Sequence, residues 1–141
     1  MSSKHEPITF RGRSTGIIIL TITQLFIGAI HVFFGLLPMS SEGSLTTLTI
    51  PAQAPLIYDV YTIVFGLLVF IFAILFWLGK RFGWVGTVAV SLFVIVADAL
   101  TLFDLPSIPG IPKFAALTEI TYSLLVVLYL SQAHVRRKYL S

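Results

Sequence analysis

Four long apolar runs constrain this chain more than any other feature of its sequence. They are 18 to 23 residues long and cover residues 17–37, 56–78, 84–103 and 114–131. A helix of about 20 apolar residues crosses a hydrocarbon core about 30 Å thick. Because the chain has 141 residues in all, little of it is left for a second domain. The sequence therefore predicts a single all-α domain over residues 1–141, a polytopic membrane protein built as a four-transmembrane-helix antiparallel bundle.

The composition excludes several classes of function. Hydrophobic residues make up 57% of the chain and charged residues only 11%, which excludes a soluble enzyme and a nucleic-acid-binding module. The chain contains no cysteine, so disulfides, thiolate nucleophiles and cysteine zinc sites are excluded as well. We therefore expect a protein that is not an enzyme, has no nucleic-acid partner and needs no cofactor, with a divalent metal ion kept as an alternative.

The distribution of basic residues predicts the topology. Eight of the nine Lys and Arg residues lie in the N-terminal tail, in the loop between the second and third runs, or in the C-terminal tail, and Lys113 is the exception. The side of a membrane protein that is rich in Lys and Arg is the cytoplasmic side. We therefore expect a multi-pass protein of the cell membrane with both termini in the cytoplasm. The outer loop 38–55 then faces the other side, with a short strand or hairpin around residues 45–50.

Each apolar run carries one stripe of small and polar residues at helical spacing. Such residues gather where membrane helices meet, because they allow close backbone approach and interhelical hydrogen bonds. On the fourth run the stripe comprises Ala115, Thr118, Glu119 and Tyr122. Gln24 lies among apolar neighbours and is expected to bond to Ser91 or Thr87. The residues predicted to pack between helices are Gln24, Gly28, Gly35, Gly66, Thr87, Ser91 and Tyr122.

One ionisable residue from each run lies at a similar depth. These residues are His31, Asp59, Asp98 and Glu119, and at 1.5 Å per residue all four sit roughly 5 to 9 Å below the outer boundary. A charged side chain is costly when it faces lipid, so we expect the four to turn inward and pair. Two arrangements are possible: a functional site that binds a divalent metal ion or relays protons, or a structural network of hydrogen bonds. The chain lacks the spacings typical of metal sites, which favours the structural network, with Tyr58, Tyr61, Thr62 and Tyr122 as its hydrogen-bonding partners.

Three stretches of the sequence carry a resemblance to a known group of proteins. They are Arg11-Gly12-Arg13 leading to Ile22-Thr23-Gln24 and Gly28, the junction from Phe76 to Trp84, and Tyr129-Leu130 followed by Val135-Arg136. With these stretches the chain resembles uncharacterised small four-span integral membrane proteins of bacteria and archaea. The resemblance implies a prokaryotic four-helix protein with cytoplasmic ends, and it brings no activity or catalytic residues.

Two functions remain open at the level of sequence. The first is an accessory or structural subunit that packs its apolar outer face against partner subunits of a larger membrane complex, for example a respiratory or monooxygenase assembly. The alternative is a small homo-oligomeric transporter or channel for protons or metal ions, which would use the layer of His31, Asp59, Asp98 and Glu119. In both cases the expected surroundings are membrane lipids and either partner subunits or further copies of the chain.

Overall fold

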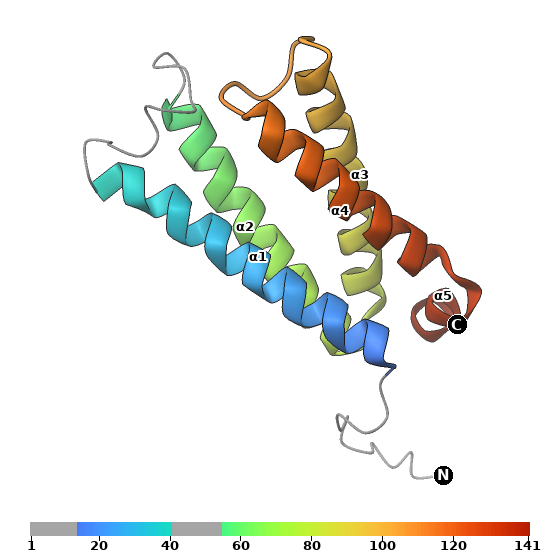
Figure 1. The fold of residues 1–141 in the computed structure, drawn as a ribbon. Helices are drawn as coiled ribbons and strands as arrows, with labels where there is room; N and C mark the ends of the chain where they lie inside the picture. Colours follow the sequence, from blue (N-terminus) through green and yellow to red (C-terminus); the bar gives the residue numbers. More distant parts are fainter. Residues whose placement is uncertain (1–13, 41–54) are drawn as a thin grey trace, which may run out of the picture.

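A computed structural model describes residues 14–40 and 55–141 of the chain. Its regular elements in these ranges are all helices: α1 (Thr15–Ser40), α2 (Pro55–Trp77), α3 (Arg81–Leu102), α4 (Lys113–Ser131) and α5 (Ala133–Leu140) (Figure 1). The first four are long and apolar enough to cross a membrane. The predicted all-helical fold with four membrane-spanning helices is therefore confirmed, and the protein is a multi-pass membrane protein. The expected outer-loop hairpin around residues 45–50 lies outside the described residues.

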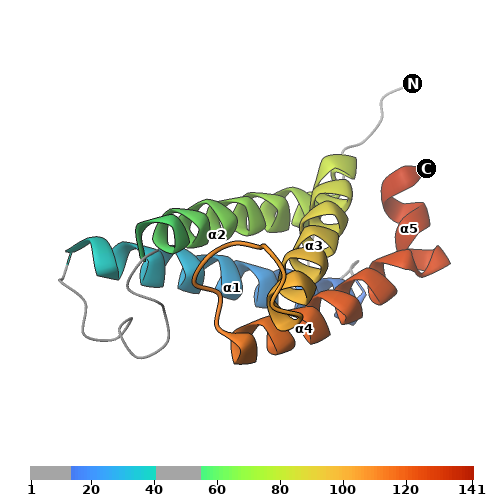
Figure 2. The same cartoon turned by 90° about the horizontal axis from the view of Figure 1, so that it is seen from above.

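The four long helices are arranged as two pairs. α1 packs along α2, α3 packs along α4, and α2 and α3 connect the pairs, whereas α1 and α4 have hardly any close backbone approach. The pairs lie close together at the end that holds α5 and diverge toward the opposite end, as two views of the ribbon show (Figures 1 and 2). We call the end with α5 the basic end, because Lys80, Arg81 and the Arg136–Lys138 run lie there.

Two glycines explain the intimate contact between α1 and α2. A Cβ atom added to Gly28 would lie 2.8 Å from the carbonyl oxygen of Gly66, and one added to Gly66 would lie 2.7 Å from the carbonyl oxygen of Gly28. Real side chains do not tolerate such distances to a backbone atom, so only glycine fits at both positions. The two backbones therefore meet directly, as small residues allow in membrane proteins.

The main hydrophobic core lies at the basic end and includes α5. Val135 and Tyr139 of α5 are buried there, and the ring of Tyr139 stacks on that of Phe76 at a centroid distance of 4.6 Å. The Tyr139 hydroxyl donates a hydrogen bond of 3.1 Å to the backbone carbonyl of Phe76. The basic residues of α5 are exposed on its other side. α5 was not predicted from the sequence, and it closes the basic end of the bundle. The core consists of Ile17, Leu20, Phe76, Val126, Leu130, Val135 and Tyr139.

The helix limits differ from the predicted spans by a few residues. α1 continues through Pro38 to Ser40, and α3 begins at Arg81 instead of Trp84. The turn between α2 and α3 is therefore shorter than expected, and Gly79 adopts a φ of 72° there, which favours glycine. At the opposite end, Lys113 forms an ion pair of 2.7 Å with Asp104 across the loop between α3 and α4.

Candidate functional site

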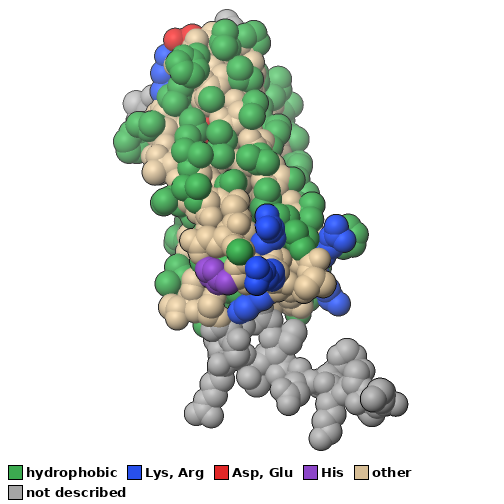
Figure 3. Space-filling model, turned by 90° about the vertical axis from the view of Figure 1, so that its right-hand side faces the viewer, with side chains coloured by type: hydrophobic (Ala, Val, Ile, Leu, Met, Phe, Trp, Pro, Cys, Tyr) green, Lys and Arg blue, Asp and Glu red, His purple; other side chains and the backbone are tan. Residues whose placement is uncertain are grey.

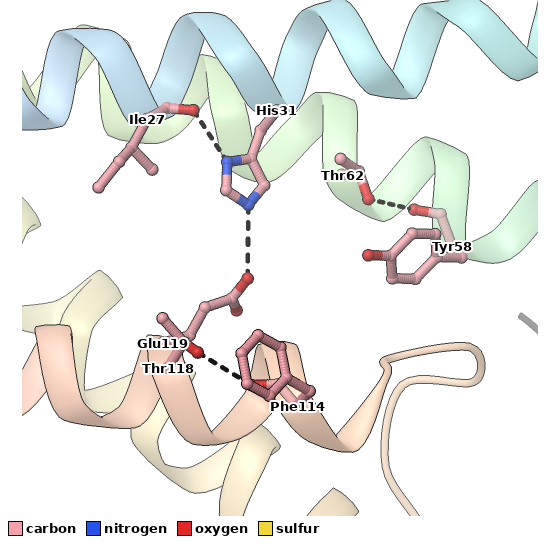
Figure 4. A network of polar contacts seen from close by, with 7 residues as sticks. All are labelled: Ile27, His31, Tyr58, Thr62, Phe114, Thr118 and Glu119. Carbon is pink, nitrogen blue, oxygen red and sulfur yellow. Dashed lines mark hydrogen bonds and ion pairs between the residues drawn. The ribbon is translucent and has the colours of Figure 1, made fainter. Parts of the chain in front are cut away.

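His31 of α1 and Glu119 of α4 face each other where the two helix pairs diverge (Figure 4). Their atoms Nε2 and Oε1 are 3.6 Å apart, which is an ion-pair contact longer than a hydrogen bond. The other ring nitrogen, Nδ1, lies 2.8 Å from the backbone carbonyl oxygen of Ile27. A carbonyl only accepts, so Nδ1 carries a proton and Nε2 is directed at the carboxyl group. The pair is partly exposed, with 22% of the His31 side chain and 31% of the Glu119 side chain accessible.

A second carboxyl group lies close to this pair. Asp98 of α3 is fully buried and interacts electrostatically with Glu119, yet neither of its carboxyl oxygens has a hydrogen-bond partner among the described residues. Tyr58 and Tyr61 of α2 lie within electrostatic range of both carboxyl groups. The structure therefore brings three of the four predicted ionisable residues together, on α1, α3 and α4.

The fourth predicted residue, Asp59, takes no part in the pair. It is buried on α2, and its backbone carbonyl packs against Gly35 of α1. Within residues 14–40 and 55–141, no group of three or more His, Asp and Glu side chains is arranged to hold a metal ion. The arrangement can hold and transfer protons, since it contains an imidazole and two interacting carboxyl groups.

Three of the four expected hydrogen-bonding partners of this network do not bond to it. The hydroxyl of Thr62 donates a hydrogen bond of 2.8 Å to the backbone carbonyl of Tyr58, one turn earlier on the same helix. The hydroxyls of Tyr61 and Tyr122 are buried and have no hydrogen-bond partner in the described part of the chain. The predicted hydrogen bonds of Thr62, Tyr61 and Tyr122 to this network are therefore wrong, although Tyr122 lines the same cavity as His31 and Glu119.

A cavity of about 280 Å³ lies between the four long helices, beside the His31–Glu119 pair. Its wall is mostly apolar, with a few hydroxyl and amide groups. The apolar part of the wall was not predicted from the sequence, since these residues look like ordinary lipid-facing or core positions. The lining residues on α1 and α2 are Ile27, Phe65, Val69 and Phe72, besides Gln24 and His31; those on α3 and α4 are Val90, Val94, Thr118 and Ser123, besides Thr87, Ser91, Glu119 and Tyr122.

Three polar groups of the cavity wall have no hydrogen-bond partner within the described residues. They are the side-chain oxygen of Gln24, the hydroxyl of Thr87 and the hydroxyl of Tyr122. Gln24 and Thr87 are 5% and 2% exposed, so they are removed from bulk water. The predicted hydrogen bond of Gln24 to Ser91 or Thr87 is therefore wrong. The reason is that the cavity lies between α1 and α3 at this level and keeps these side chains apart.

The predicted packing residues occupy different environments. Gly28, Gly35 and Gly66 lie in the contact between α1 and α2. On α4, the residues that are fully buried are Ala116, Ser123, Val126 and Leu130. Three residues of the predicted stripe, Thr118, Glu119 and Tyr122, line the cavity together with Ser123. Tyr122 also packs against the main core, so the cavity side and the packed side of α4 adjoin.

Comparisons with protein-family models, with curated proteins and with solved structures found no match to this chain.

Proposed function

We propose that this protein is a non-enzymatic accessory or structural subunit of a larger membrane complex, for example a respiratory or monooxygenase assembly. One observation supports this proposal above others: most of each helix faces outward. Only 22–33% of the most apolar window of each long helix is buried inside the chain. An apolar helix surface within a membrane faces lipid or another membrane protein, and aromatic side chains are enriched in contacts between proteins.

The outer surface fits this proposal in its composition and its charge. Large side chains such as Phe26, Phe93 and Phe114 are 66%, 52% and 84% exposed. Hydrophobic side chains cover most of the face drawn in Figure 3, and most Lys and Arg side chains gather at one end, whereas the other end carries one basic side chain beside an acidic one. By the positive-inside rule, this basic end would lie in the cytoplasm of a cell-membrane protein, together with both termini.

Site-specific photocrosslinking in native membranes tests the proposal. A diazirine amino acid is placed at one outward position of each long helix, namely Phe26, Leu67, Phe93 or Leu125, and at the buried Val94 as a control. We expect at least one outward position to form a crosslink to another membrane protein, because a subunit interface covers part of the apolar surface. The Val94 position should react only within the chain.

Native gel electrophoresis after extraction in mild detergent provides the complementary measurement. The crosslinked protein should migrate with this chain in fixed stoichiometry, and mass spectrometry identifies it. Crosslinks to lipid alone at all four outward positions, combined with migration as a monomer, would contradict the proposal. Crosslinks only between copies of this chain would instead support a homo-oligomer.

A second candidate function is a small homo-oligomeric proton transporter or channel. The specific observation that favours it is the group formed by His31, Glu119 and Asp98, in which an imidazole faces one carboxyl group and a second carboxyl group is buried nearby. Ionisable residues within membrane helices are costly and commonly serve as proton relays. The metal-ion form of this function gains no support from the arrangement of the described residues.

Proton flux into liposomes tests the transport candidate. If the protein conducts protons, Asp98→Asn and Glu119→Gln are expected to abolish the flux, because each removes a proton-binding group while keeping the shape of the side chain. Asp104→Asn is the matched control, since Asp104 lies exposed in the loop between α3 and α4. Wild-type flux no greater than that of empty liposomes would exclude this function, as would unchanged flux in both variants.

A further inference from the structure

The intramembrane cavity is mostly apolar and carries polar side chains at several levels along the helices. Gln24 and His31 both line it from α1, and seven residues of α-helix correspond to roughly 10 Å. The unpartnered Gln24 oxygen and Thr87 hydroxyl mark one end, and the His31–Glu119 pair marks the other. Phe65, Val69 and other apolar side chains form the wall between them.

The unpartnered groups are costly unless something binds to them. A buried polar group without a hydrogen bond destabilises a fold by about 1–3 kcal/mol. Gln24 and Thr87 belong to different helices, α1 and α3, yet both line this cavity and neither has a partner among the described residues. The Tyr122 hydroxyl of α4 is a third such group. Each of the three atoms has almost no accessible surface in this conformation, so a molecule in the cavity bonds to it only when the side chain turns toward the cavity.

The size of the cavity is suited to a small organic molecule. An apolar cavity of roughly 150 Å³ in another protein binds benzene, so a volume of about 280 Å³ has room for a fused pair of rings. The wall is mainly aromatic and β-branched, which suits a flat or compact hydrocarbon body. Among the described residues, no Lys or Arg side chain lines the cavity and its wall is mostly apolar, so an uncharged molecule fits it best.

We propose that this cavity binds a small uncharged lipophile, a molecule with a ring-sized apolar body, a hydroxyl group at one end and a hydroxyl or carbonyl group at the other. The hydroxyl at the first end donates to the Gln24 oxygen and accepts from the Thr87 hydroxyl, and the other end lies against His31 and Glu119. The ligand reaches the cavity from the bilayer between α1 and α4, where the backbones hardly approach each other and the side chains of the pair are partly exposed. This proposal is independent of both functions proposed above.

Binding of 2,6-dihydroxynaphthalene to the full chain in lipid nanodiscs tests the proposal. Equilibrium dialysis against empty nanodiscs of the same lipid subtracts the probe that dissolves in the bilayer. We expect about one saturable site per chain, and at least fivefold weaker binding of naphthalene, which has the same ring body but no hydroxyl. The reason is that each hydrogen bond to a buried group contributes about 1 kcal/mol.

Variants then locate the bound probe. Gln24→Leu and Thr87→Val should each weaken the binding of the diol several-fold and leave that of naphthalene unchanged. Thr121→Val is the matched control, because Thr121 is exposed on α4 and its hydroxyl bonds to Leu117 of its own helix. Val69→Trp fills the cavity and should abolish binding of both compounds in protein that still elutes as a single species.

Three results would overturn the proposal. The first is binding no greater than that of empty nanodiscs for every probe. The second is equal affinity for the diol and naphthalene, with no effect of the Gln24 and Thr87 variants. The third is unchanged binding in a folded Val69→Trp protein, since the probe would then lie elsewhere on the molecule.

Discussion

Replacing Gly28 with valine is expected to destabilise the bundle more than any other single change on α1. The first added carbon would lie 2.8 Å from the carbonyl oxygen of Gly66 and 3.0 Å from the backbone nitrogen of Phe70. Because these atoms belong to the backbone of α2, they cannot move aside as a flexible side chain would. Overpacking a core typically costs up to roughly 3 kcal/mol, and we expect Gly28→Val to lower the free energy of unfolding by more than this.

Thermal unfolding in detergent, followed by circular dichroism, measures this effect. Ala29→Val is the matched control, since Ala29 is the next residue of α1 and is exposed. Gly66→Val should be about as harmful as Gly28→Val, and the double variant should cost less than the two separately, because both push apart the same pair of backbones. Equal stability of the Gly28→Val and Ala29→Val proteins would contradict the close α1–α2 contact.

Replacing Tyr139 with alanine is expected to detach α5 from the bundle. This change removes the ring that stacks on Phe76 and the hydrogen bond to the Phe76 carbonyl, and truncation of a buried aromatic side chain costs about 3–5 kcal/mol. α5 has eight residues, too few to be stable as an isolated helix in water. Trypsin should therefore cleave after Arg136, Arg137 and Lys138 at least ten times faster than in the wild type.

Two variants and an internal control separate this effect from general unfolding. Tyr139→Phe keeps the ring and loses one hydrogen bond, so cleavage should accelerate only a few-fold. Leu140→Ala changes a residue that is 38% exposed, and it should have little effect. Cleavage after Lys80 and Arg81, in the turn between α2 and α3, should remain at the wild-type rate. A Tyr139→Ala protein whose tail is no more sensitive than wild type would show that α5 does not depend on this contact.

Local sequence was sufficient for the long helices because the membrane imposes their length and composition. A run of about 20 apolar residues must satisfy its own backbone hydrogen bonds in lipid, and a helix does so within the segment. α5 was not predictable in the same way. Its stability depends on Val135 and Tyr139 packing against residues far away in the chain, such as Phe76. The alternation of buried and basic residues along it is the one sequence signal that could have indicated this helix.

The candidate site was only partly predictable. Depth along each helix follows from residue counting, and it predicted His31, Asp98 and Glu119 at a common level. The structure places His31 in contact with Glu119 and Asp98 close to Glu119. Asp59 has a similar depth but is buried beside Gly35, in the contact between α1 and α2. Rotation about the helix axis and the distance between helices decide such details, and neither can be obtained from spacing within one helix.

The sequence by itself determined that this chain is a multi-pass membrane protein with four spanning helices, and that each helix has one polar side. The tertiary structure alone decided that the two helix pairs meet at the basic end and diverge at the other. The physical reason is the unequal contact between helices. Gly28 and Gly66 hold α1 and α2 together over their length, and the core around Phe76 joins all the helices at the basic end. The cavity and the His31–Glu119 pair occupy the space that these contacts leave open.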